Sequence, residues 1–158
     1  QIVTIDCDDT KDRDDAVYVE KTKDGISYDM KKLEKICRLL KERANFVADI
    51  YNSSQYFYKA PQTYDEKGVK KSWKEETPTL MKELIEVLEK VSDFTSPNTE
   101  EAVTEWVASK EIGFGKIMNP FRLAIIGSAE GPHMFDIIEI LGKDETLTRL
   151  HRIIEILK

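Results

Sequence analysis

The chain has 158 residues, with 24 lysine and arginine residues against 30 aspartate and glutamate residues, so its formal net charge is −6. The length suits one or two small domains with a hydrophobic core, and the acidic balance argues against indiscriminate coating of DNA. No apolar run approaches the roughly 20 residues of a membrane span, no secretory signal opens the chain, and its two cysteines match neither a disulfide framework nor a zinc signature. We therefore expect a cytoplasmic monomer with no membrane or DNA partner, and the opening Gln1 suggests a piece of a longer protein.

The first 25 residues form an acidic segment with strand-forming residues near both ends. Ile2–Ile5 and Val17–Val19 favour strands. The carboxylates crowded between them repel one another unless a cation neutralises them, and Mg²⁺ is the usual hard cation in such a place. These aspartates are Asp6, Asp8, Asp9, Asp12, Asp14 and Asp15. Residues 1–25 are therefore predicted to be a short β-like segment, foreign or fused to the rest.

The sequence of this segment resembles the active-site motif of the RNB exoribonucleases, of the RNase II and RNase R type. In that motif T-I-D precedes D-x-D-D, which is followed by A-V/I. The resemblance implies that four aspartates hold magnesium for 3′–5′ hydrolysis of RNA: Asp6, Asp12, Asp14 and Asp15. The pattern gives way to helix after Gly25, however, and an isolated acidic loop neither positions RNA nor excludes water. Three interpretations stay open, namely a foreign or solvated segment, a weak Mg²⁺ site without catalysis, and a fragment of a nuclease.

A long amphipathic helix is predicted from Met30 to about Tyr51, with Asp29 as its N-cap. Its apolar positions are Met30, Leu33, Ile36, Cys37, Leu40, Ala44 and Val47, and its basic positions are Lys31, Lys32, Lys35, Arg38, Lys41 and Arg43. We expect Cys37 in the core. The aromatic residues that follow, Tyr51, Tyr56, Phe57 and Tyr58, either fill gaps between helices or stack on unpaired RNA bases.

Three shorter helices follow in the predicted order. The first runs from Tyr64 to Trp73 and carries Lys67, Lys70, Lys71 and Lys74. Thr77 is predicted to cap the second, which has Pro78 at its first position and ends near Val91. The third covers Glu100 to Lys110, with Asn98 or Thr99 as its N-cap.

The stretch from Gly113 to Gly142 is predicted to form two short helices joined by a turn. Gly113 and Gly115 interrupt the preceding helical pattern, and Gly127 suits the left-handed residue that ends a helix. If the two helices pack as a hairpin, Arg122, Asn119 and the loop between the helices present one polar surface. A last helix, from Lys143 to Lys158, has apolar spacing typical of packing and leaves His151 exposed.

The same stretch resembles the C-terminal anticodon-binding region of bacterial glutamyl-tRNA synthetases, which carries G-x-V/I-M-x-P-x-R-L/V-A-L-x-G and then G-P-x-x-F-x-x-x-x-x-L-G-K-E. The matching residues are Gly115, Lys116, Ile117, Met118, Asn119, Pro120, Phe121, Arg122, Leu123, Ala124, Gly127, Gly131, Pro132, Phe135, Leu141, Gly142 and Lys143. An upstream block, KERANFVADIY followed by YFYKAPQTYDEKGVKKSWKEETP, agrees as well, so the resemblance covers roughly Ser27 to Lys158.

This resemblance implies a mainly α fold, the helical anticodon-binding bundle of class I glutamyl-tRNA synthetases. It implies a first helical subdomain at residues 26–111, a second at residues 112–158, and the tRNA for glutamate as partner. Arg122 is implied as the main anticodon contact, because an arginine fork donates two parallel hydrogen bonds to a base edge or a phosphate. The other implied RNA-binding residues are Arg43, Lys116, Asn119, Pro132, His133 and Met134. Some family members carry threonine where Gly131 stands, so a hydroxyl is missing here.

The sequence lacks the two catalytic motifs of a class I synthetase, which are similar to H-I-G-H and K-M-S-K. The chain by itself is therefore expected to be inactive and without cofactor, whereas the parent ligase uses ATP and Mg²⁺ to attach glutamate. Three functions therefore remain open for this chain: recognition of tRNA, a fragment of an exoribonuclease, and a helical interaction domain that binds no RNA.

Overall fold

The computed structural model describes residues 30–41, 44 and 47–157. The chain divides into two compact units, residues 1–55 and residues 56–158. Within the described ranges the regular structure is helical, which confirms the mainly α class. None of the helices in these ranges is long and apolar enough to cross a membrane. The predicted strands in residues 1–25 lie outside the described residues, and the subdomain boundary between residues 111 and 112 stays a prediction.

The described part of the first unit contains two helices, α1 (Met30–Leu40) and α2 (Val47–Ser54), where one continuous helix was predicted. Ala44 stands between them without regular secondary structure. A continuous helix cannot pack on itself, whereas the break lets α2 contact α1. The apolar side of α1 is buried at Leu33, Ile36, Cys37 and Leu40, which follow helical spacing and place the free thiol of Cys37 in the core as predicted.

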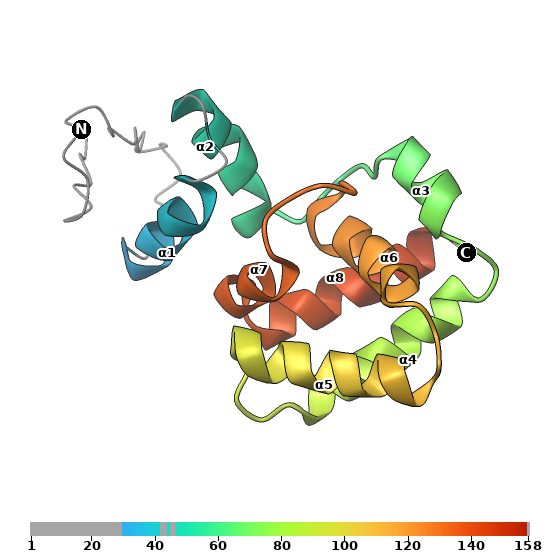
Figure 1. The fold of residues 1–158 in the computed structure, drawn as a ribbon. Coiled ribbons are helices and arrows are strands. Elements are labelled where there is room, and N and C mark those ends of the chain that lie inside the picture. The colour runs from blue at the N-terminus through green and yellow to red at the C-terminus, as the bar shows by residue number, and fades with distance from the viewer. Residues whose placement is uncertain (1–29, 42–43, 45–46, 158) are drawn as a thin grey trace. The chain divides into compact units, whose positions relative to one another are not determined.

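The second unit is built around the helix α6 (Phe114–Ile126). Its other helices are α3 (Glu66–Ser72), α4 (Thr77–Lys90), α5 (Ser96–Ser109), α7 (Met134–Leu141) and α8 (Lys143–Ile156), preceded by the short 3-10 helix η2 (Gln55–Phe57). Helix α6 contacts α3, α4, α5 and α8, and Figure 1 shows it surrounded by them. Ile117, Phe121, Leu123, Ala124 and Ile125 of α6 are fully buried, so this helix supplies the centre of the core. The predicted packing role of α8 is confirmed, and His151 is exposed on it.

Helix α5 begins four residues before the predicted start, and Pro97 lies in its first turn. The reason is tertiary, because α7 caps it: the Ser96 backbone N–H donates to Glu139 Oε2 over 2.7 Å, and the Ser96 hydroxyl donates to Asp136 Oδ1 over 2.6 Å. Thr99, predicted as a possible N-cap, is buried inside the helix, and its hydroxyl donates to the Thr95 carbonyl. One of the N-terminal N–H groups that a helix leaves unpaired, that of Ser96, is thus satisfied by a carboxylate from another helix.

Gly127 ends α6 in the left-handed conformation, with φ +77°, as predicted. A Cβ at this position would lie 2.9 Å from both Pro61 Cβ and the Thr63 carbonyl oxygen, so space also demands glycine. The Gly127 carbonyl accepts a 2.9 Å hydrogen bond from the Asp65 N–H. Asp65 in turn caps α3 through its carboxylate, which accepts from the Gly68 N–H over 2.9 Å. The start of α3 is thereby tied to the end of α6.

Glu111 follows α5 in the left-handed region, with φ +54°, where a side chain is strained. We expect Glu111→Gly to raise the free energy of unfolding by about 0.5–1 kcal/mol, since relief of strain exceeds the entropy that glycine adds to the unfolded chain. Urea denaturation followed by circular dichroism measures this. The matched control is Glu105→Gly, inside α5, which should lower stability by about 1 kcal/mol. Equal losses for both variants would contradict the prediction.

Candidate nucleic-acid interface

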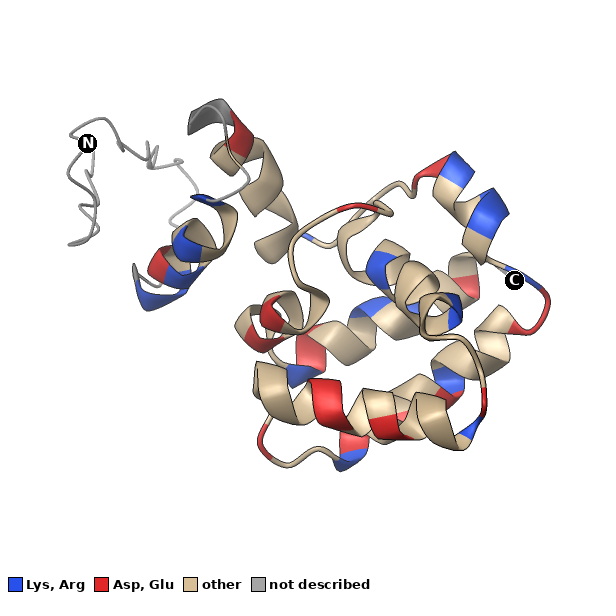
Figure 2. Ribbon diagram, in the orientation of Figure 1, with Lys and Arg blue, Asp and Glu red and all other residues tan. Residues whose placement is uncertain are grey.

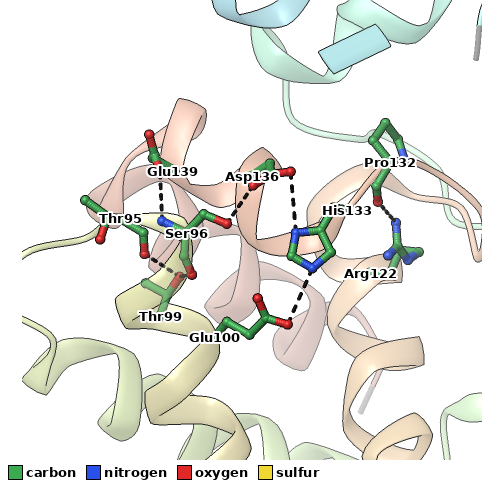
Figure 3. Close-up of polar contacts among 9 residues, drawn as sticks. All are labelled: Thr95, Ser96, Thr99, Glu100, Arg122, Pro132, His133, Asp136 and Glu139. Carbon is green, nitrogen blue, oxygen red and sulfur yellow. Dashed lines mark hydrogen bonds and ion pairs between the residues drawn. The ribbon is translucent and has the colours of Figure 1, made fainter. Parts of the chain in front are cut away.

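Arg122 lies at the side of α6 that faces the loop of residues 127–133, which connects α6 to α7. Its Nη1 atom donates a 2.7 Å hydrogen bond to the Pro132 carbonyl, and its side chain is half-buried (Figure 3). The structure thus brings Arg122 and this loop together, as the sequence predicted. They do not meet through a helical hairpin, because the main neighbours of α6 are α3, α4 and α8, whereas those of α7 are α5 and α8.

The loop offers less side-chain surface than the sequence suggested. Pro132 is buried, and Met134 is only 1% exposed because it begins α7 and points into the core. Gly131 is partly exposed, and the His133 side chain is 49% exposed. Among these residues, contact with a ligand would therefore involve the His133 ring and loop backbone groups, and not the Met134 side chain.

His133 stands between two carboxylates from different helices. Its Nε2 lies 3.5 Å from Glu100 Oε1 on α5, and its Nδ1 lies 3.4 Å from Asp136 Oδ2 on α7. The ring also tilts against Phe135, with centroids 5.6 Å apart. Both ion pairs require a protonated imidazole, and both are too long for strong hydrogen bonds. No local pattern pairs His133 with Glu100, and only the three-residue spacing of His133 and Asp136 gives a local signal.

Lys116 and Asn119 are exposed on α6, three residues apart, and Asn119 is in turn three residues before Arg122. The Lys116 Nζ atom forms a 2.9 Å ion pair with Glu76 Oε1. This hydrogen bond holds the pKa of Glu76 below its ordinary value. Both side chains are about half exposed, so salt screens the pair and an incoming phosphate can compete for Lys116.

A lysine face lies on α3, next to the same loop. Gly68 is buried against α6: a Cβ there would lie 3.0 Å from Leu123 Cδ2 and 3.6 Å from Ala129 Cβ. All four lysines of this face are exposed. The spacing of Lys67, Lys70 and Lys71 puts them on one side of α3, and Lys74 follows the end of that helix, where its Nζ donates a 2.8 Å hydrogen bond to the Lys70 carbonyl. Figure 2 shows α3 as predominantly basic and α5 as acidic. The lysine face consists of Lys67, Lys70, Lys71 and Lys74.

Several predicted site residues lie outside the described residues. They are Arg43 and the candidate magnesium ligands Asp6, Asp12, Asp14 and Asp15. Within the described ranges there is no group of three or more histidine, cysteine, aspartate or glutamate residues that could hold a metal ion. The role of the aspartates stays a prediction.

Comparison with known proteins identifies the family. Residues 17–154 match the family model described as anticodon binding domain. The chain is 51% identical over 133 residues to the glutamate–tRNA ligase of Flavobacterium johnsoniae, covering 84% of this chain and 26% of that protein. It is 46% identical over 134 residues to the corresponding ligase of Phocaeicola vulgatus, covering 85% of this chain and 26% of that protein.

Solved structures agree with the sequence relatives. The crystal structure of a glutamate tRNA ligase from Elizabethkingia meningosepticum, in complex with its amino acid, superposes with a TM-score of 0.80 at 41% identity, covering 85% of this chain and 26% of that chain. Glutamate-tRNA synthetase from Elizabethkingia anophelis gives a TM-score of 0.72 at 38% identity, covering 82% of this chain and 25% of that chain. This chain therefore spans about a quarter of the length of these relatives. These findings favour the synthetase resemblance over the exoribonuclease one, and the chain belongs to the anticodon-binding domain family, as the counterpart of that domain in glutamate–tRNA ligases.

Proposed function

We propose that this chain recognises the anticodon loop of the tRNA for glutamate, as one part of a cytoplasmic, monomeric glutamate–tRNA ligase. The ATP- and Mg²⁺-dependent attachment of glutamate belongs to the catalytic part of such a ligase, outside this chain. The observation that carries the proposal is the Arg122 guanidinium, which the Pro132 carbonyl holds beside the loop of residues 127–133 in a domain of the anticodon-binding family.

The chemistry of Arg122 suits a single-stranded target. Bases in an RNA loop can be splayed out and read on their edges, and a guanidinium can donate two parallel hydrogen bonds to one edge. The 2.7 Å bond to Pro132 restricts the rotamers of Arg122. A side chain that is already oriented loses less entropy when the base arrives, so more of the contact energy remains for discrimination.

The lysine face on α3 supplies a complementary, sequence-independent attraction. Four exposed lysines lie on or just after α3, the helix whose Gly68 adjoins Ala129 of the loop, in a chain whose formal net charge is −6. Phosphate contacts of this kind position an RNA without reading its bases. We therefore assign orientation of the tRNA backbone to α3 and base discrimination to Arg122 and its loop.

A binding titration tests the proposed function. This chain is titrated with the tRNA for glutamate and with the same tRNA carrying an altered anticodon, each at two salt concentrations. Preference for the native anticodon at both salt concentrations is the expected result. Equal weak binding that vanishes with salt would reduce the interaction to electrostatics and overturn the proposal. No binding to either tRNA would favour a helical interaction domain.

Neutralising part of the lysine face should weaken binding to both tRNAs by the same factor. In the Lys70→Gln/Lys71→Gln variant, we expect the slope of log K against log salt concentration to become shallower by roughly 1–2, because about one counterion is released per phosphate contact. The control is Lys82→Gln/Lys90→Gln on α4, which changes the net charge equally. If the control moves the slope as much as the α3 variant, the assignment of α3 is wrong.

A further inference from the structure

A groove of about 640 Å³ runs between the end of α4 and one side of α5. Its lining contains neither Arg122, nor the loop of residues 127–133, nor the lysine face of α3. The proposed recognition of tRNA therefore makes no use of this groove. What the groove can bind follows from the side chains that line it.

The apolar part of the lining comes from both helices. Val87 and Val91 contribute from the end of α4, Trp106 contributes from α5, and all three are partly exposed. Within the described ranges the indole N–H of Trp106 has no hydrogen-bond acceptor, whereas that of Trp73 donates to the Leu157 carbonyl over 2.9 Å. A partly exposed tryptophan in a groove offers both ring surface and a polar handle, which is typical of an interaction surface.

The polar part of the lining is predominantly acidic. Asp93, Glu101 and Glu105 are exposed there, against one exposed lysine, Lys90. Glu101 and Glu105 lie one turn apart on α5, where like charges destabilise a helix, and Figure 2 shows this helix as acidic. Neither of these two carboxylates has an ion-pair or hydrogen-bond partner among the described residues. A cation between them would remove their repulsion.

We propose that this groove docks a basic peptide segment of a partner protein, with an arginine of that segment over the Trp106 ring and beside the carboxylates of Glu101 and Glu105. An aromatic face attracts a cation, and the carboxylates accept charge-assisted hydrogen bonds from it. Arginine suits the place because its planar guanidinium stacks on a ring and donates in several directions, while its apolar stem can pack on Val87 and Val91. The negative charge of the groove repels RNA phosphates, so this surface is separate from tRNA recognition.

The test is a titration of this chain with a capped tetra-arginine peptide, followed by the indole N–H signals in proton–nitrogen NMR spectra. The chain has two tryptophans, so Trp73, with its N–H bonded to the Leu157 carbonyl, is an internal reference. We expect a saturable shift of the Trp106 signal and an unchanged Trp73 signal, and no shift with a capped tetra-glutamate peptide. An unmoved Trp106 signal, or equal shifts of both signals, would overturn the proposal.

Neutralising the acidic side of the groove should weaken this binding. We expect Glu101→Gln/Glu105→Gln to lower the affinity for the tetra-arginine peptide about threefold to tenfold, because two partly solvated charge interactions are lost. The matched control, Glu86→Gln/Glu89→Gln, removes the same charge from exposed positions of α4 that do not line the groove. Equal losses in both variants would mean that net charge alone attracts the peptide, and would overturn the assignment to the groove.

Two further results would replace the basic peptide by another occupant and so overturn the proposal. A Trp106 signal that moves when the chain alone is diluted would assign the groove to a second copy of this chain. A Trp106 signal that moves on addition of tRNA would assign it to the RNA interface. The anticodon preference of Glu101→Gln/Glu105→Gln should equal that of the unaltered chain, so failure of this proposal is distinguishable from failure of the proposed function.

Discussion

Arg149→Met should lower the free energy of unfolding by about 3 kcal/mol, the largest stability effect that we expect from a single polar residue in the described ranges. Arg149 is 1% exposed on α8. Its Nη1 atom donates 2.7 Å hydrogen bonds to the carbonyls of Tyr56 and Ile125, and its Nε donates to Glu145 Oε1 over 2.7 Å. Methionine fills much of the volume but leaves two carbonyls without this donor, and each buried acceptor without a partner costs about 1–3 kcal/mol.

The measurement is urea denaturation at neutral pH, with the slope of the transition checked for a change in cooperativity. Arg152→Met, one turn away on the surface of α8, is the matched control. Arg152 is partly exposed and donates a 3.2 Å hydrogen bond to Gln62 Oε1, so we expect a change of less than about 1 kcal/mol. Equal changes in the two variants would show that burial and the two carbonyl bonds of Arg149 contribute little.

Arg122→Ala should remove about 1–3 kcal/mol of discrimination between the native and the altered anticodon. This is the largest functional effect that we expect. Alanine removes both the fork and the donor to the Pro132 carbonyl, so part of any loss could come from the loop. Arg122→Lys separates these causes, because lysine keeps a charged donor but cannot make two parallel bonds. We expect Arg122→Lys to discriminate nearly as poorly as Arg122→Ala while keeping more of the total affinity.

The discrimination is measured by titration with both tRNAs under the same salt conditions, and unfolding curves confirm that the variants are folded. Lys116→Ala is the control on the same helix. It should weaken binding to both tRNAs alike, since Lys116 is exposed, is paired with Glu76 and is suited to phosphate. Retained discrimination in Arg122→Lys would mean that the positive charge at position 122, and not the two-bond fork of arginine, distinguishes the anticodons. Retained discrimination in Arg122→Ala would remove Arg122 from base recognition altogether.

Local sequence signals predicted most of the helices for identifiable reasons. The apolar spacing of α4, α6 and α8 reappears as buried faces, and Gly127 ends α6 because it alone suits φ +77° there. Two small errors were the start of α3, at Glu66 and not Tyr64, and the N-cap of α4, which is Glu76 and not Thr77. Two other boundaries were wrong by more. The break between α1 and α2 follows no glycine or proline, and the early start of α5 depends on Glu139 and Asp136, some 40 residues away in the sequence. Capping by a distant helix leaves no trace in a local pattern.

At the candidate site, too, some features were predicted from the sequence and others depend on tertiary contacts. The family's sequence motifs correctly placed Arg122 next to the loop. They also suggested Met134 as an RNA contact, but the Met134 side chain is buried. No local pattern indicated that Arg149 is buried, since an arginine on α8 is normally solvated. Its two carbonyl partners are 93 and 24 residues away in the sequence.

The sequence by itself determined the helical class, the family and the proximity of Arg122 to the loop. These depend on the periodicity of apolar residues, on short motifs, and on the ten residues that separate Arg122 from Pro132. Only the tertiary structure decided which charges are buried, which carboxylates contact the start of α5, and how His133 lies between Glu100 and Asp136. These features depend on contacts between residues of different helices. Such contacts exist only once the core of the second unit has brought those helices together.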